Sequence, residues 1–149
     1  MGMGTIHQDF KDFLKLLNKN GVKYLLIGGY AVGYYGYPRA TADMDIWVGI
    51  SVQDNVDKLI SSLGEFGIHI DEKTSLLFAK DGKMLRIGFP PVRLEILSEV
   101  SGVEFETCYK KSTTATIGDI EIKLISLEDL KKNKKASGRH KDLDDLENL

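Results

Sequence analysis

The sequence predicts an α/β (α+β) fold, a single domain in which a mixed β-sheet is flanked by helices. Three observations support this expectation. The chain has 149 residues, of which 42% are hydrophobic and 28% charged, as is typical of one globular domain. Apolar patterns with helical and strand spacing alternate along it. No internal repeat, low-complexity tract or long linker interrupts the sequence.

The first half of the chain alternates helices with strands. Apolar residues at helical spacing predict a first helix that stops at Asn20-Gly21, and a glycine pair turns the chain after the strand that follows. The expected elements of this half are a helix over 6–19, strands over 22–27 and 43–48, a short helix over 30–35, and a helix whose N-cap is Ser51.

The second half is richer in strands. Asp81-Gly82 is a hairpin signal, because both residue types tolerate the positive φ of a tight turn. Ser126 opens a helix with a start like a capping box, and Gly138 ends it. The other expected elements are strands over 75–79, 84–88, 92–97, 104–109 and 114–123 and a last helix over 139–148. The sheet-bearing core therefore covers about residues 22–125, with C-terminal helices over about 126–148.

Charge and composition narrow the function classes. The net charge is −2, which argues against bulk binding of nucleic acid or acidic membranes as the main task. The single Cys108 excludes an internal disulfide and is compatible with a reducing cytoplasm. No apolar run approaches the roughly 20 residues of a membrane helix, and no signal peptide is visible. We therefore expect a cytoplasmic protein with no membrane partner.

Asp43 and Asp45 are the most informative residues. Alternate side chains of a strand point to the same face, so these carboxylates project together while Met44, Ile46 and Val48 face a core. The two negative charges repel each other, and a divalent metal would compensate them. Two solvated carboxylates on an exposed face explain the pair alone equally well.

Gly28-Gly29 lies between the first expected strand and a helix. Glycine lets the backbone approach a phosphate closely, and a helix N-terminus favours an anion. A tight turn without a ligand is the commoner use of a lone glycine pair.

Glu95 is the third carboxylate of interest. It alternates with apolar residues in the expected strand 92–97 and so lies on the opposite face from them. If this strand neighbours that of the aspartate pair, three carboxylates converge and can hold two Mg²⁺ ions about 3.5–4 Å apart, as in two-metal nucleotidyl transfer. Glu95 could also act as general base toward an acceptor hydroxyl. The alternative is a strand charge paired with Arg93 or Arg86.

In this order, the motifs resemble a known family. Gly28-Gly29, thirteen residues, Asp43-Met44-Asp45-Ile46 and a later Glu95 on another strand look like the nucleotidyltransferase fold of the polymerase-β-like superfamily. Arg39 and Thr41, in the pattern Arg-x-Thr-x-Asp-x-Asp, are similar to a subgroup of small prokaryotic members from abortive-infection and toxin–antitoxin systems.

The tail from Lys134 to Leu146 resembles the ending of the same group, so the resemblance covers about residues 22–147. It implies transfer of a nucleoside monophosphate from an NTP, with ATP the first candidate, to an acceptor, with release of pyrophosphate. The acceptor stays open between a small-molecule hydroxyl, an RNA 3′ end and a protein side chain. Because the chain after Glu95 is short, a protein partner or a homo-oligomer is expected to complete the pocket.

Roles in that reaction are implied residue by residue. Asp43, Asp45 and Glu95 would bind Mg²⁺ and form the catalytic triad, although aspartate is commoner than glutamate at the third position. Gly28 and Gly29 would contact the triphosphate.

Basic residues supply further candidates. Arg39, just before the metal strand, is a phosphate ligand or the salt-bridge partner of an aspartate, and Thr41 binds nucleotide or hydrogen-bonds locally. Most of the basic run 131–141 is interpreted as a solvated helix face. Arg139 and Lys141 are singled out because they lie in the family-like tail and could contact a triphosphate or a polynucleotide.

Two rival hypotheses remain. The first is a catalytically inert nucleotide-binding or partner-binding module, in a toxin–antitoxin-like or other regulatory assembly, that keeps the fold without turnover. The second is a nucleic-acid-binding domain, which predicts steeply salt-dependent binding. The mildly acidic charge balance argues against the second hypothesis.

Overall fold

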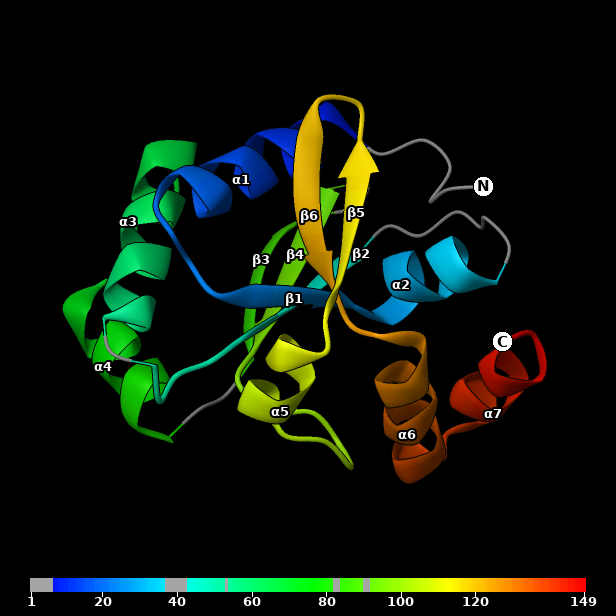
Figure 1. The fold of residues 1–149 in the computed structure, drawn as a ribbon. Coiled ribbons are helices and arrows are strands. Elements are labelled where there is room, and N and C mark those ends of the chain that lie inside the picture. Colours follow the sequence, from blue (N-terminus) through cyan, green and yellow to red (C-terminus); the bar gives the residue numbers. More distant parts are fainter. Residues whose placement is uncertain (1–6, 37–42, 53, 82–83, 90–91) are drawn as a thin grey trace.

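A six-stranded mixed sheet forms the centre of the computed structural model, which describes residues 7–36, 43–52, 54–81, 84–89 and 92–149 (Figure 1). The strand order is β3-β4-β2-β1-β6-β5. Strand β2 runs antiparallel to β1 and parallel to β4, and β1 runs parallel to β6. The strands are β1 (Tyr24–Ile27), β2 (Asp43–Val48), β3 (Leu85–Phe89), β4 (Val92–Leu97), β5 (Thr113–Ile117) and β6 (Ile120–Leu124).

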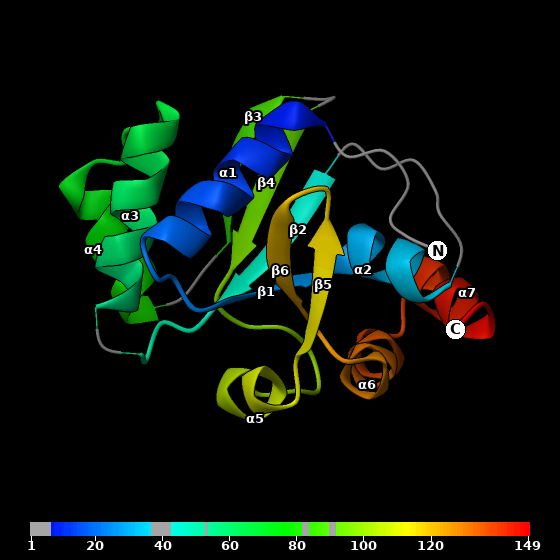
Figure 2. The ribbon, with the colours of Figure 1, turned by 45° about the horizontal axis from the view of Figure 1, so that its top comes forward.

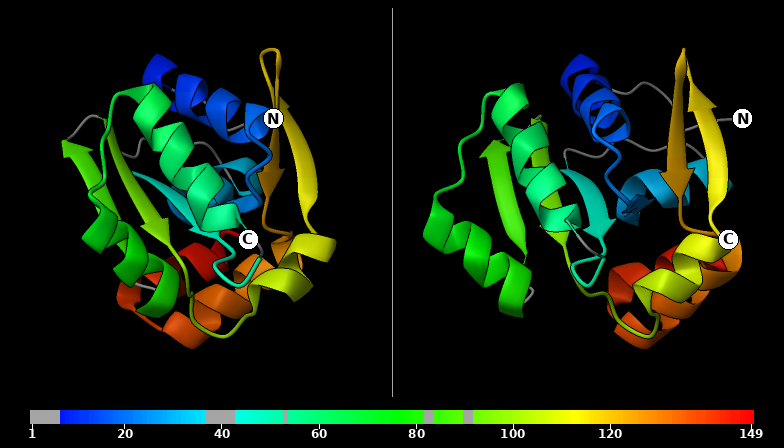
Figure 3. Two further views of the ribbon diagram at one scale, coloured as in Figure 1. Left: turned by 90° about the vertical axis from the view of Figure 1, so that its left-hand side faces the viewer. Right: turned by 60° about the vertical axis from the view of Figure 1, so that its left-hand side comes forward.

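Helices cover both faces of this sheet. Helix α1 packs against α3 on one side, and α5 and α6 lie on the other (Figures 2 and 3). Helix α2 lies against β1 and β2 and next to α6. The helices are α1 (Gln8–Lys19), α2 (Gly28–Tyr35), α3 (Asn55–Phe66), α4 (Glu72–Asp81), α5 (Phe105–Lys110), α6 (Leu127–Ser137) and α7 (His140–Glu147). Among the residues described, none of these helices has the length and apolarity needed to cross a membrane.

The hydrophobic core lies where the central strands meet these helices. All of β1 is buried, because it is covered on both faces. Met44, Ile46 and Val48 of β2 are fully buried, as the alternating pattern predicts. Trp47 points the other way but is buried as well, and its Nε1 donates a hydrogen bond of 3.1 Å to the Ser98 carbonyl. Strand β2 therefore presents polar groups only at its N-terminal end.

The predicted α/β (α+β) sheet and several boundaries are confirmed. Strand β2 spans the expected residues 43–48, and the last two helices occupy the expected region. Ser126 caps α6 by accepting a hydrogen bond from the Asp129 N–H, and Gly138 ends that helix at φ 64°. The single stretch expected at 114–123 divides into β5 and β6 around Gly118, which also has positive φ.

Two expected strands are helices instead. Residues 75–79 lie within α4, so they form no hairpin with β3. Among residues 72–80 of this helix only Phe78 is buried, while Leu76 and Leu77 are 62% and 51% exposed, so the apolar run does not mark a strand in the core. Residues 104–109 form the start and body of α5, because Phe105 and Cys108 bury one face at helical spacing.

Ser51 is not the N-cap of α3, which begins after Asp54 instead. Asn55 fixes this start, because its buried amide bonds to the Lys23 N–H and to the carbonyls of Lys23 and Gly49. The helix start is thus tied to the chain just before β1 and to the end of β2.

Candidate functional site

The glycine pair lies where β1 passes into α2. Gly28 has φ 67°, a backbone conformation that favours glycine. A Cβ built on Gly28 would also lie only 2.9 Å from Asp45 Cγ. Both the backbone conformation and the neighbouring carboxylate therefore require glycine here. The predicted tight turn and helix start are confirmed, and the turn lies directly against the aspartate pair.

The three carboxylates come together as expected. Asp43 and Asp45 share one face of β2, and Glu95 is the register partner of Asp45 on the neighbouring parallel strand β4. Both carboxyls line the same pocket. The condition on which the sequence argument depended, that β4 neighbours β2, is therefore met.

Asp43 and Glu95 each have an arginine partner. Arg93 Nε and Nη2 donate hydrogen bonds of 2.8 Å to the two carboxylate oxygens of Asp43. Arg86 Nε on β3 donates one hydrogen bond of 3.1 Å to Glu95 Oε1. Of the two arginines considered for Glu95, the structure thus pairs Arg86 with it and Arg93 with Asp43.

The two aspartates have opposite electrostatic environments. The Arg93 guanidinium lowers the pKa of Asp43 below its usual value of 3.8. Burial, followed by the hydrogen bond and charge of Glu95, raises the pKa of Asp45 to about 7. Asp45 Oδ1 is buried and receives no hydrogen bond from the described part of the chain. Adjacent carboxyls with separated pKa values are typical of acid–base and metal sites.

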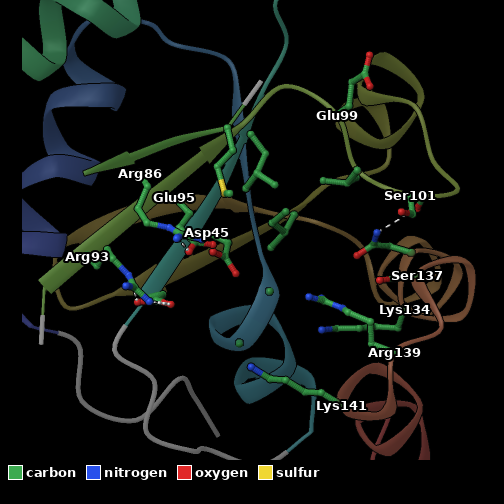
Figure 4. Close-up of a pocket in the computed structure, with 18 residues that line it drawn as sticks. Asp45, Arg86, Arg93, Glu95, Glu99, Ser101, Lys134, Ser137, Arg139 and Lys141 are labelled. Carbon is green, nitrogen blue, oxygen red and sulfur yellow. Dashed lines mark hydrogen bonds and ion pairs between the residues drawn. The ribbon is translucent and has the colours of Figure 1, made fainter. Parts of the chain in front are cut away.

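A basic wall faces these carboxylates from α6 and α7. Figure 4 shows Lys134, Arg139 and Lys141 on the far side of the pocket from Asp45 and Glu95, with Lys134 and Arg139 extending toward them. Residues 131, 132 and 135 are exposed, as expected of a solvated helix face. Lys134 corrects that interpretation, because it is only 5% exposed and lines the pocket.

Buried aspartates hold this wall in place. Lys134 Nζ lies 3.1 Å from Asp142 Oδ1 and 3.2 Å from Asp145 Oδ2. Arg139 Nε donates a hydrogen bond of 2.7 Å to Asp142 Oδ2, and Ser137 Oγ donates to the same oxygen. These partners outweigh the effect of burial and lower the pKa of Asp142. Because the ion pairs join α6 to α7, they fix the two helices that carry the cations relative to each other.

The carboxylates and the cations line one cavity of about 730 Å³. It brings together every predicted site residue whose position is described. Arg39 and Thr41 lie outside the described residues. The predicted residues in the cavity wall are Gly28, Gly29, Asp43, Asp45, Glu95, Arg139 and Lys141.

Sequence reasoning missed other residues of the wall. Besides Lys134, the cavity is lined by Asn133, Ser101, Leu97 and Val100, which form its end farther along β4 and α6. Lys134 carries no local signal of its burial, because its partners Asp142 and Asp145 lie on the next helix. The other four carry no pattern that separates them from ordinary core and loop residues.

The donor chemistry at the carboxylates fits Mg²⁺, which prefers oxygen ligands. Asp45 Oδ1, buried without a hydrogen-bond donor, is the kind of atom that a cation would satisfy. Yet no three His, Cys, Asp or Glu side chains in the described ranges are already arranged to hold a metal ion. With Asp43 and Glu95 turned toward arginines, binding a metal would require these side chains to rearrange.

Comparisons with known proteins add no assignment to this geometry. A scan against protein-family models gives no match, and no curated protein matches the chain. The functional argument therefore depends on the carboxylates, the glycine turn and the basic wall.

Proposed function

We propose that this protein is a Mg²⁺-dependent nucleotidyltransferase that transfers a nucleoside monophosphate from an NTP to an acceptor. The observation that carries the proposal is one pocket with three carboxylates on adjacent strands and a basic wall opposite them. The Gly28 turn precedes all these groups in the chain and also borders the pocket. Its spacing to Asp43 and Asp45 supports the polymerase-β-like nucleotidyltransferase fold as part of the proposal.

Binding of the nucleotide would use opposite sides of the pocket. The N–H groups of Gly28 and Gly29, at the N-terminus of α2, suit triphosphate oxygens. Arg139 and Lys141 offer N–H donors from the other wall, where Lys134 and Arg139 are also paired with Asp142.

The chemical step would use the carboxylates. Asp43, Asp45 and Glu95 would hold Mg²⁺, which lowers the pKa of an attacking hydroxyl and neutralises charge on the leaving pyrophosphate. The acceptor oxygen forms a bond to the α-phosphorus, and the bond from that phosphorus to the β-phosphate bridging oxygen breaks. Glu95 accepts the proton of the acceptor hydroxyl.

Transfer of label tests this proposal. The protein is incubated with α-labelled NTPs, Mg²⁺ and host extract, and labelled products are separated. We expect Asp43→Asn to reduce labelling on the order of 100-fold, because it removes a proposed metal ligand. Asp119→Asn is the matched control, since Asp119 is an exposed carboxylate outside the pocket. Equal labelling by wild type and Asp43→Asn would contradict the mechanism.

One observation favours a second candidate, an inert nucleotide-binding module. Arg93 and Arg86 neutralise Asp43 and Glu95 without a metal, as in a site that has exchanged catalysis for stability. Calorimetry with ATP and Mg²⁺ followed by a pyrophosphate-release assay separates the two functions. Binding without release in any extract fraction supports the inert module.

A further inference from the structure

Arg93 and Asp43 form a bidentate ion pair on the sheet side of the pocket. Two hydrogen bonds of 2.8 Å join the guanidinium to both carboxylate oxygens. The side chains are only 29% and 28% exposed, and their backbones are register partners on β4 and β2. Bidentate pairs of this kind are the strongest charge-assisted hydrogen bonds in proteins. The sheet therefore holds the guanidinium at the carboxylate.

The Arg93 guanidinium and a divalent cation would require the same carboxylate. A cation bound by Asp43 would stand close to the guanidinium, and the two positive charges would repel each other. In the described part of the chain, no set of three donors is already arranged for a metal. Loading a metal at Asp43 is therefore coupled to the departure of Arg93.

We propose that Arg93 and a divalent cation exchange at Asp43, and that the released guanidinium then binds a phosphate of the substrate. This inference builds on the proposed function, because it needs the carboxylates to take a metal. Arg93 lines the same cavity as the basic wall of α6 and α7, on the opposite side (Figure 4). Its planar donors match phosphate oxygens in the same bidentate way as they match a carboxylate.

The Arg86 side chain makes fewer hydrogen bonds than that of Arg93 and is more exposed. It makes a single hydrogen bond of 3.1 Å to Glu95, and its side chain is 55% exposed. Both arginines line the sheet side of the pocket, so each glutamine substitution removes one positive charge from the same wall. Arg86→Gln is therefore the matched control for a general electrostatic effect.

Metal binding is the first readout. Mn²⁺ is titrated into wild type, Arg93→Gln, Arg93→Lys and Arg86→Gln, and free Mn²⁺ is measured by electron paramagnetic resonance. We expect Arg93→Gln to bind about tenfold more tightly than wild type, and Arg86→Gln to change affinity less than about threefold. Arg93→Lys keeps the charge without the bidentate geometry, so its affinity should lie between those of wild type and Arg93→Gln.

Nucleotide binding is the second readout. A non-hydrolysable ATP analogue is titrated in saturating Mn²⁺, and we expect Arg93→Gln to bind it about tenfold more weakly than wild type. Tighter metal binding together with weaker nucleotide binding is a pair of opposite changes that a purely structural role would not produce. Circular dichroism checks that each variant is folded. If Arg93→Gln is unfolded, Arg93→Lys takes its place in both measurements.

The outcomes separate the exchange from the metal site itself. If wild type binds Mn²⁺ and Arg93→Gln binds it no more tightly than Arg86→Gln does, the exchange is overturned while the metal site stands. If Arg93→Gln binds the nucleotide analogue as tightly as wild type, the phosphate role is overturned. If none of the four proteins binds Mn²⁺, the metal site fails, and the exchange fails with it.

Discussion

Asp45 and Glu95 are register partners on the parallel strands β2 and β4, and both carboxyls line the same pocket. Two neighbouring carboxyls repel each other when both are ionised, so one of them keeps its proton to a higher pH. Burial and the neighbouring Glu95 place that proton on Asp45, whose pKa rises to about 7. The centre of the pocket therefore changes its charge near neutral pH, and both stability and metal binding should report that change.

Asp45→Asn should become more stable relative to wild type as pH rises. The folded-state pKa of Asp45 is raised from 3.8 to about 7, so its contribution is fully present below pH 3.8 and is lost as pH rises through 7. An asparagine keeps a neutral donor toward Glu95 at every pH. The free energy of unfolding of the variant minus that of wild type, measured in urea, should be about 2 kcal/mol larger at pH 8 than at pH 5.

Asp43→Asn is the contrasting variant for the same experiment. The pKa of Asp43 is lowered by Arg93, so its contribution is present above pH 3.8 and is lost only as pH falls below that value. Asp43→Asn should be less stable than wild type, and the difference in the free energy of unfolding should be the same at pH 5 as at pH 8. A stability difference for Asp45→Asn that is also the same at both pH values would refute the raised pKa.

Gly28→Ala should destabilise the protein by about 2–4 kcal/mol. Positive φ strains any residue with a Cβ, and here the Cβ would also collide with the Asp45 carboxylate. Gly64→Ala is the control, because Gly64 lies inside α3, has open space around its Cβ position and should gain about 0.5–1 kcal/mol. Chemical denaturation measures the free energy of unfolding of both variants. Equal changes in the two would show that the turn at Gly28 does not require glycine.

How far the sequence predicts the site depends on whether the signal is local. The alternation in 43–48 defines β2 and its polar face, because side-chain parity is a property of one strand. The pairing of β2 with β4 joins residues 50 positions apart, which no local pattern encodes. Glu95 could therefore be selected as a candidate from its own strand, while its contact with Asp45 needed the fold.

For Lys134 and α4 the local sequence pattern leads to a wrong prediction. Lys134 reads as one lysine in a basic run, and its burial depends on α7 turning back after Gly138 to present two aspartates. In α4 the apolar run Leu76-Leu77-Phe78 resembles a strand, but only Phe78 reaches the core. Tertiary contacts decided both cases, and neither is visible in a short window of sequence.

Lys134→Met should cost about 3 kcal/mol of stability, because it removes the buried cation that pairs with Asp142 and Asp145. Lys131→Met, on the exposed face of the same helix, should change stability by less than about 0.5 kcal/mol. Thermal and urea unfolding compare the two variants. A Lys134→Met protein as stable as Lys131→Met would show that the ion pairs joining α6 to α7 contribute nothing net.

Mg²⁺ binding should release a proton from the pair formed by Asp45 and Glu95. A metal prefers ionised carboxylates, so Asp45 must lose the proton that its raised pKa retains at pH 6. The apparent affinity should therefore rise by up to about tenfold per pH unit below pH 7 and level off above it. Calorimetry in two buffers of different ionisation enthalpy counts the protons released. At pH 6 wild type should release close to one proton and Asp45→Asn almost none, and equal heats in both buffers for wild type would contradict a shared proton at this pair.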